Sequence, residues 1–191
     1  MGSLPPEISG IVRYPAAQRQ LGSALSRLLD LVFPPRCTGC QRVGSIFCPQ
    51  CLARVRAVPR PVCLRCGQPQ PSEALCADCR AGKFYISAIR SAGIYTRPLS
   101  GAIQQFKYSG RAELRRPLGM LLASYWRERG VSADLVIAVP LHERRQRERG
   151  YNQAHLLASE FCRQVGLPLV SQGVLRRQRE TRQQVLLGPA D

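Results

Sequence analysis

Four Cys-x-x-Cys pairs constrain this chain more than any other feature of its sequence. They place eight of the nine cysteines between residues 37 and 79. Two sulfurs with this spacing can face one metal ion from a single tight turn, and two such pairs complete a tetrahedron of thiolates around Zn²⁺. The sequence therefore predicts two structural zinc sites. Their predicted ligands are Cys37, Cys40, Cys48, Cys51, Cys63, Cys66, Cys76 and Cys79.

The spacers between these pairs favour a sequential arrangement of the two sites. Seven residues separate the first two pairs and nine separate the last two. Each of these neighbours can close a short loop, whereas joining the first pair to the third would close a longer loop at a greater entropic cost. We therefore expect the first four cysteines to hold one ion and the last four to hold the other. A crossed arrangement stays open.

Two other kinds of cysteine chemistry compete with zinc. A disulfide scaffold needs an oxidising compartment, yet residues 1–30 contain no apolar run followed by a signal cleavage site. Four cysteines also suit an iron–sulfur cluster, but four evenly paired turns favour zinc. The cysteine window is also too short to build a core without its metals. The expected cofactors are therefore two structural Zn²⁺ ions.

Basic residues dominate the charge of the chain. It has 28 Lys and Arg against 12 Asp and Glu, which gives a formal net charge of +16. Because each zinc tetrathiolate carries a charge of −2, the metal-loaded chain would carry about +12. Such a field attracts phosphate-bearing partners, either nucleic acid or a phosphorylated metabolite. The open alternative is a generally arginine-rich surface without a specific partner.

The length of 191 residues allows one or two domains. The longest apolar runs, such as residues 135–141, are too short to cross a bilayer, so we expect a cytoplasmic protein without a membrane span. Changes in composition predict three regions. These are a flexible N-terminal extension (1–20), a helix plus double zinc ribbon (21–82), and an α/β domain (83–191).

Apolar residues at helical spacing predict four helices. Prolines at positions 34 and 35 would stop the first helix just before the cysteines, and Gly130 and Gly166 would end the third and fourth. Pro117 would mark either a kink or a late first turn of the third. The predicted ranges are 21–32, 98–106, 112–130 and 156–165.

Strands are predicted at three places, with a mobile loop at 175–184. Residues 134–139 lack polar alternation, which is typical of the buried middle of a parallel sheet. This strand runs into a basic segment, residues 140–153, and ligands of open α/β sheets bind at the carboxyl ends of the strands. The segment therefore predicts an anion site. The predicted strands cover residues 85–95, 134–139 and 167–170.

Two motifs after the cysteine pairs carry a family resemblance. The first is Phe-Lys-Tyr-Ser-Gly-Arg at residues 106–111, and the second is Arg-Gly-Tyr-Asn-Gln-Ala at 149–154, which follows Pro-Leu-His at 140–142. Together with an arginine-rich segment at 175–184, they resemble the ComF family. Its members are phosphoribosyltransferase-like proteins with an N-terminal double zinc ribbon, associated with DNA uptake in natural competence.

The resemblance implies a fold and a site for the second half of the chain. It implies a partial type I phosphoribosyltransferase-like parallel sheet with helices, and it places the pyrophosphate loop at residues 140–152. Guanidinium groups suit diphosphate oxygens, and a glycine lets the backbone approach them. A solvated helix start, in which Glu143 and Glu148 pair with neighbouring arginines, stays open. The implied diphosphate-binding residues are Pro140, Arg144, Arg145, Arg149, Gly150, Tyr151 and Asn152.

The second loop of such a site is missing from the sequence. The family's paired aspartates and following Thr-Thr-Gly turn, which cradle the 5′-phosphate, do not occur, and residues 185–191 are a poor substitute. The chain is either C-terminally shortened or continues in the intact protein. We therefore expect weak or no binding of phosphoribosyl pyrophosphate, with Mg²⁺ taking part only where the complete site exists.

Two functions of different class follow. The first is a phosphoribosyltransferase linked to DNA uptake, for which no catalytic residue can be named and which this chain alone would not complete. The alternative is a non-catalytic zinc-ribbon module that binds single-stranded DNA or a competence protein of the uptake machinery. Two further residues with reactive side chains, Cys162 and His155, do not favour either function. Cys162 is expected to be a small buried residue, and His155 a packed or capping residue of its helix.

Overall fold

The computed structural model describes residues 11–12, 34–82 and 85–179. The chain divides into two compact units, one of residues 22–105 and one of residues 106–191 together with 1–21. The helix predicted at 21–32 lies outside the described residues, and the predicted domain ranges stay predictions. Within the described part, no helix is long and apolar enough to cross a membrane.

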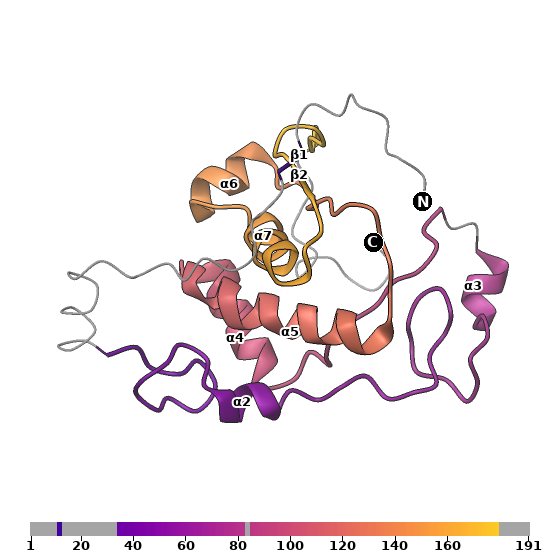
Figure 1. The fold of residues 1–191 in the computed structure, drawn as a ribbon, viewed down its shortest axis with the longest axis horizontal. Helices are drawn as coiled ribbons and strands as arrows, with labels where there is room; N and C mark the ends of the chain where they lie inside the picture. The colour runs from indigo at the N-terminus through magenta and orange to yellow at the C-terminus, as the bar shows by residue number, and fades with distance from the viewer. Residues whose placement is uncertain (1–10, 13–33, 83–84, 180–191) are drawn as a thin grey trace. The chain divides into compact units, whose positions relative to one another are not determined.

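The unit of residues 22–105 contains one small motif twice (Figure 1). Each copy has an antiparallel bridge beside its first cysteine pair, Arg36 with Val43 and Val62 with Pro69. Each copy then has a short helix that carries the second pair, α2 (Pro49–Ala53) and α3 (Ala77–Ala81). Equivalent residues lie 26 apart at the bridges and 28 apart at the helices. This arrangement is a double zinc ribbon, as predicted.

The strand predicted at residues 85–95 is wrong. This segment has no regular secondary structure and instead follows the irregular surface of the ribbons. Its backbone makes separate hydrogen bonds, from the Ile89 N–H to the Arg65 carbonyl at 2.6 Å and from the Ile94 N–H to the Arg56 carbonyl at 2.8 Å. The apolar residues that suggested a strand therefore have no partner strand. Ile86 and Ile89 are about half exposed.

The next two predicted helices are confirmed. Between these two helices the chain makes a turn at Ser109 and Gly110 and then a short 3₁₀ helix. Pro117 lies in the first turn of the second helix, where its missing N–H breaks no hydrogen bond. Gly130 ends that helix in the left-handed conformation, with φ of 58°. The elements are α4 (Leu99–Tyr108), η1 (Ala112–Leu114) and α5 (Arg115–Arg129).

The last predicted helix is also confirmed, as α7 (Gln153–Val165). Gly166 ends it with φ of 77°. The basic segment before it, predicted as an anion-binding loop, contains the seven-residue helix α6 (Glu143–Arg149). The structure thus has a helix start in this segment, the alternative left open by the sequence.

Strands are short in the described residues. Leu169–Val170 form β2, within the range predicted, and pair antiparallel with β1 (Ile11–Val12), which the sequence did not predict. The strand predicted at 134–139 is reduced to one parallel bridge, Val136 with Leu169. The Val136 N–H donates to the Pro168 carbonyl and the Val170 N–H to the Val136 carbonyl, both at 2.9 Å. An extended parallel sheet is not present in the described residues.

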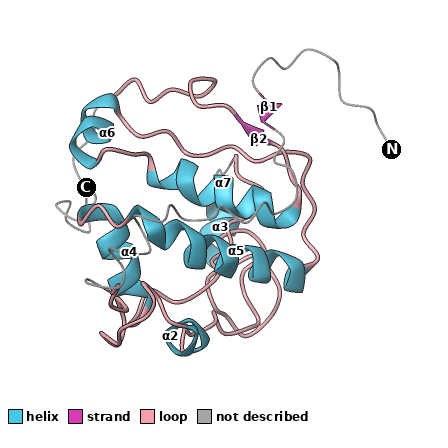
Figure 2. Cartoon of the chain, turned by 60° about the vertical axis from the view of Figure 1, so that its left-hand side comes forward, coloured by secondary structure: helices cyan, strands magenta, loops and turns pink. Residues whose placement is uncertain are grey.

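Helices α5 and α7 lie side by side and form the largest helix contact of their unit (Figures 1 and 2). Gly119 of α5 permits the close approach, because a Cβ atom there would lie 2.5 Å from Cγ of Glu160. Further along, Trp126 and Phe161 meet edge to face with ring centroids 5.4 Å apart. A small residue and an aromatic pair therefore set the spacing of the two helices.

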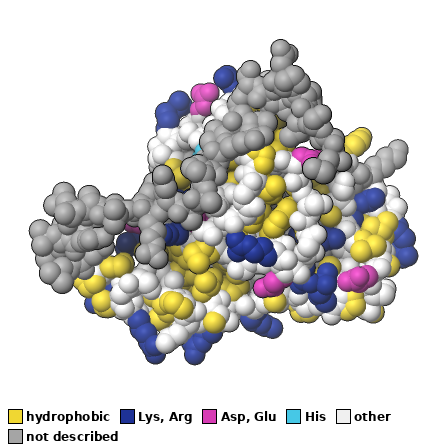
Figure 3. Space-filling view, in the orientation of Figure 1, with side chains coloured by type: hydrophobic (Ala, Val, Ile, Leu, Met, Phe, Trp, Pro, Cys, Tyr) yellow, Lys and Arg dark blue, Asp and Glu magenta, His cyan; other side chains and the backbone are white. Residues whose placement is uncertain are grey.

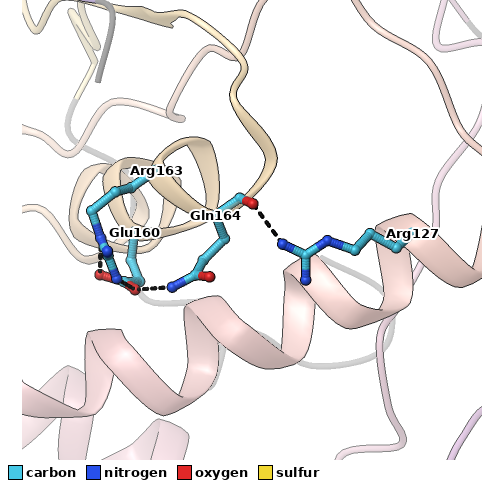
Figure 4. A network of polar contacts seen from close by, with 4 residues as sticks. All are labelled: Arg127, Glu160, Arg163 and Gln164. Carbon is cyan, nitrogen blue, oxygen red and sulfur yellow. Dashed lines mark hydrogen bonds and ion pairs between the residues drawn. The ribbon is translucent and has the colours of Figure 1, made fainter. Parts of the chain in front are cut away.

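Glu160 is the buried charge in this contact, and it is fully compensated (Figure 4). Its carboxylate accepts hydrogen bonds from the Arg163 guanidinium and, at 2.9 Å, from Nε2 of Gln164. Arg127 of α5 donates to the Gln164 carbonyl near the end of α7. A buried carboxylate without partners would destabilise the fold. Its partners on α7 offset that cost, and the Arg127 hydrogen bond joins α5 to the end of α7.

Candidate functional site

The eight clustered cysteines form two separate groups of four. The first group contains Cys37, Cys40, Cys48 and Cys51, and the second contains Cys63, Cys66, Cys76 and Cys79. Within each group all four sulfur atoms lie within 4.8 Å of one another. The prediction of sequential sites is therefore confirmed, and the crossed arrangement is excluded.

The sulfur spacing fits zinc. In a regular tetrahedron with metal–sulfur bonds of about 2.3 Å, neighbouring sulfurs lie about 3.8 Å apart. The structure has Cys40 and Cys48 sulfurs 3.7 Å apart and Cys66 and Cys76 sulfurs 3.8 Å apart. All nine cysteines lie in the described part of the chain, and none forms a disulfide. The two sites are consistent with two structural zinc ions.

Backbone N–H groups stabilise one thiolate in each site. The Cys48 N–H points at the Cys37 sulfur and the Cys76 N–H at the Cys63 sulfur, both at 3.3 Å. Burial opposes ionisation of Cys37, but the hydrogen bonds outweigh it and lower the pKa of this thiol. The hydrogen bond from Cys76 is the main reason that the pKa of Cys63 is also lowered. Each ribbon thus favours the thiolate form of one of its cysteines.

The last cysteine of each site behaves in the opposite way. Burial, followed by hydrogen bonds with the neighbouring cysteines, raises the pKa of Cys51 and of Cys79. Four thiolates cannot all stay ionised at such short distances without a compensating cation. A divalent ion supplies that charge and displaces the remaining protons. Both sites therefore suit a tightly held metal, and acid would release it.

The tight turn after each first cysteine pair needs a left-handed residue. Gly67 takes this role in the second ribbon with φ of 74°, and Gln41 takes it in the first with φ of 64°. Their N–H groups donate to the carbonyls of Cys63 and Cys37, at 3.1 and 2.9 Å. A Cβ at Gly67 would lie 2.6 Å from the Ile89 carbonyl oxygen. Only the second turn therefore requires glycine.

The second unit contains a cleft of about 350 Å³. Two segments line it, one that follows Val136 and one that follows Leu169, and these two residues form a parallel bridge. The first turn of α7 also lines it. Charged residues of both signs line it, with two arginines and one glutamate. The polar lining consists of Glu143, Gln146, Asn152, His155, Ser171, Gln172, Arg176 and Arg177.

Two of the seven implied diphosphate residues, Pro140 and Asn152, line this cleft. Asn152 is the N-cap of α7, because its Oδ1 accepts the N–H groups of Ala154 and His155 at 3.0 and 3.3 Å. Its Nδ2 donates to the Val139 carbonyl at 3.3 Å. Asn152 therefore ties the wall of the cleft to α7. The other five residues lie outside the lining: Arg144, Arg145, Arg149, Gly150 and Tyr151.

Tyr151 and Gln153 bind backbone carbonyls at the end of α4. The Tyr151 hydroxyl donates to the Phe106 carbonyl at 2.6 Å, and Gln153 Nε2 donates to the Lys107 carbonyl at 3.5 Å. Carbonyls in the last turn of a helix have no partner within that helix. The two motifs that carry the resemblance, at 106–111 and 149–154, thus bind each other directly. Gly150 supports this arrangement by ending α6 with φ of 76°.

The arginines of the basic segment have protein partners. Arg149 lies over the Tyr108 ring, 5.0 Å from its centroid, and donates to Gln153 Oε1 at 3.2 Å. Arg144 pairs with Glu148 at 3.1 Å. Arg147 pairs with Glu143 at 4.0 Å. These are the ion pairs of a solvated helix start, and a diphosphate role for the segment stays a prediction.

Several residues of the cleft were not singled out as ligand residues by the sequence. Ser171, Gln172 and Arg176 follow the carboxyl end of β2, so their position after a short apolar strand was the available signal. His155 was expected to pack or cap, but it lines the cleft. Cys162 is fully buried, as predicted, and burial raises the pKa of its thiol to about 11.

Comparisons with known proteins agree with these sites. Residues 28–80 match the double zinc ribbon domain family. The chain is 30% identical over 151 residues to competence protein F of Haemophilus influenzae, covering 76% of this chain and 60% of the relative. It is 29% identical over 132 residues to competence protein ComFC of Bacillus subtilis, covering 64% and 54%. It is 32% identical over 134 residues to DNA utilization protein YhgH of Salmonella typhimurium, covering 66% and 59%.

The fold and the two four-cysteine sites define a double zinc ribbon protein with a second, largely helical unit. Its similarity to the competence and DNA utilization proteins supports the resemblance to the ComF family. The chain spans 54 to 60% of the length of these three curated relatives. A search of the solved structures found no significant match.

Replacing Cys63 by serine should remove one zinc ion and leave the other. Cys63 belongs to the second site alone, and each site closes within its own ribbon. We expect about two zinc ions per chain in the unaltered protein and about one in Cys63→Ser, measured by elemental analysis. The buried Cys162→Ser variant is the control and should keep both ions. Loss of both ions in Cys63→Ser would contradict two independent sites.

Replacing Tyr151 by phenylalanine should destabilise the fold by about 1 kcal/mol, because it leaves the Phe106 carbonyl without its donor while keeping the ring contact. Urea unfolding measures this loss. Tyr108→Phe removes an exposed hydroxyl and should change stability by less than about 0.5 kcal/mol. Equal stability of Tyr151→Phe and the unaltered protein would contradict the structural role of this hydroxyl.

Proposed function

We propose that this chain takes part in the uptake or use of DNA and that its cleft binds the diphosphate end of a phosphoribosyl pyrophosphate-like ligand. The names of the relatives, competence proteins and DNA utilization proteins, support the first part. The second part rests on the resemblance of the chain to phosphoribosyltransferase-like proteins and on the position and lining of the cleft.

The position of the cleft is the observation that carries the proposal. Val136 and Leu169 form a parallel bridge, and the residues that follow each of them in the chain line the cleft. Ligands of α/β folds bind at this C-terminal side of parallel strands. Its volume of about 350 Å³ suits a small molecule. Arg176 and Arg177 exceed the single Glu143 in charge, so an anion is favoured over a cation.

The cleft accounts for binding rather than for complete catalysis. The 191 residues do not include the paired aspartates and Thr-Thr-Gly turn that would hold the ribose 5′-phosphate. Phosphate contacts would then come from side chains at the diphosphate end alone. Mg²⁺ would join the ligand only in a site that also supplies those residues. Phosphoribosyl transfer would therefore need more than the residues of this chain.

Calorimetric titration with inorganic pyrophosphate and with phosphoribosyl pyrophosphate tests this proposal. We expect both to bind with similar affinity, and about 1 mM of either to stabilise the fold by less than about 1 kcal/mol. Arg176→Ala should weaken binding at least fivefold, because Arg176 lines the cleft. The matched control Arg179→Ala removes an exposed arginine outside the lining and should have no effect. Equal binding by both variants would contradict the proposed site.

The second candidate is the zinc-ribbon module, as a binding surface for single-stranded DNA or for a protein of the uptake machinery. The described part of residues 34–105 has nine arginines and two acidic residues. Two zinc tetrathiolates reduce this excess to about +3. On the face shown in Figure 3, basic side chains occur in separate groups rather than along one stripe. The small net charge of about +3 favours a weak electrostatic surface.

Salt dependence tests this second candidate. Fluorescence anisotropy with a labelled single-stranded oligonucleotide should show an affinity that falls at least tenfold between about 50 and 200 mM salt, because each neutralised phosphate releases a counterion. An uncharged peptide nucleic acid of the same sequence is the control and should not bind. Binding that is insensitive to salt would contradict an electrostatic module.

A further inference from the structure

His155 is a cleft residue whose ring is not used by the N-terminal cap of α7. It lies in the first turn of α7, where its backbone N–H takes part in the Asn152 cap but its ring does not. The residue lines the cleft. Its Nδ1 atom is buried and has no hydrogen-bond partner among the described residues. The predicted capping role therefore does not account for the imidazole.

The burial of Nδ1 selects one form of the ring. A buried N–H without an acceptor costs more than a buried lone pair without a donor, so the proton of a neutral imidazole favours the other nitrogen. Burial also lowers the pKa of His155, which favours the neutral ring at neutral pH. In this form Nε2 carries the hydrogen and is the ring nitrogen that can donate into the cleft.

The cleft has a use for such a donor. The N–H groups of Ala154 and His155, at the start of α7, are already bound by Asn152 Oδ1. They do not serve a ligand as long as this cap is in place. The lining also offers donors on its side chains. The charged ones are Arg176 and Arg177, which follow β2, and Glu143 of α6 is the only acidic side chain in the lining.

We propose that His155 is a ligand-contacting residue of the cleft, which donates a hydrogen bond from Nε2 to a phosphate oxygen of the ligand. This inference rests on the proposed function of the cleft. It adds an uncharged donor on α7 to the two arginines after β2. A ligand with a diphosphate group has enough oxygen acceptors to meet both kinds of donor.

Nitrogen NMR of the zinc-loaded full chain tests the proposal directly. With ¹⁵N-labelled histidine, His155 should be neutral at pH 7 with its proton on Nε2. Inorganic pyrophosphate should shift its Nε2 signal in a saturable way. His142, the other histidine, is outside the cleft lining but lies between Leu141 and Glu143, which line it. Its Nε2 signal should therefore move less than that of His155.

Matched variants give the energetic test. His155→Phe keeps a ring of similar shape without a donor and should weaken pyrophosphate binding about fivefold, the loss of one neutral hydrogen bond. His155→Gln retains an N–H donor and should recover most of the affinity. Arg179→Ala, at an exposed position outside the lining, should bind like the unaltered protein. Circular dichroism and zinc content check that each variant is folded.

Each other outcome has a definite meaning. Pyrophosphate binding that leaves the His155 signals unchanged, or a His155 ring protonated on Nδ1, overturns this inference and leaves the proposed function standing. The same holds for equal affinities of His155→Phe and the unaltered protein. Absence of pyrophosphate binding to the unaltered chain overturns both proposals. The spectra of the unaltered protein decide the matter even where a variant fails to fold.

Discussion

Repulsion among closely placed thiolates is the constraint on which the ribbon unit depends. Its two groups of sulfur atoms lie at the spacing of a zinc tetrahedron, and a buried cysteine in each group resists ionisation. A divalent cation converts this unfavourable arrangement into the strongest set of bonds in a unit with few buried apolar side chains. The turns, bridges and short helices around each site then follow from the need to present four sulfurs to one ion.

The second unit depends on a different interaction, the hydrogen bonds between the motifs at residues 106–111 and 149–154. Tyr151 and Gln153 bind the carbonyls at the end of α4, while Asn152 between them caps α7 and contacts the wall of the cleft. Residues that the resemblance implies for diphosphate binding thus have defined structural tasks. The cleft is lined by residues after β2 and by His155, and the arginines of α6 lie outside the lining.

Sequence reasoning succeeded where local chemistry determines structure. The cysteine spacing predicted both metal sites, and glycines predicted the ends of α5 and α7. It failed where tertiary contacts decide. Ile86 and Ile89 looked like strand residues but follow a ribbon surface. The sequence left the basic segment open between an anion loop and a helix start, and the structure has the short helix α6 with local i to i+4 ion pairs. The pairing of Ile11 with Val170 joins residues far apart in the sequence, which no local pattern could indicate. The cleft likewise forms from separate segments.

Zinc K-edge X-ray absorption of the protein purified without added metal is the most direct test of the central claim. The account predicts four sulfur neighbours per zinc at about 2.3 Å and no nitrogen or oxygen neighbour. Fewer than four sulfurs per ion, or iron in place of zinc, would contradict it.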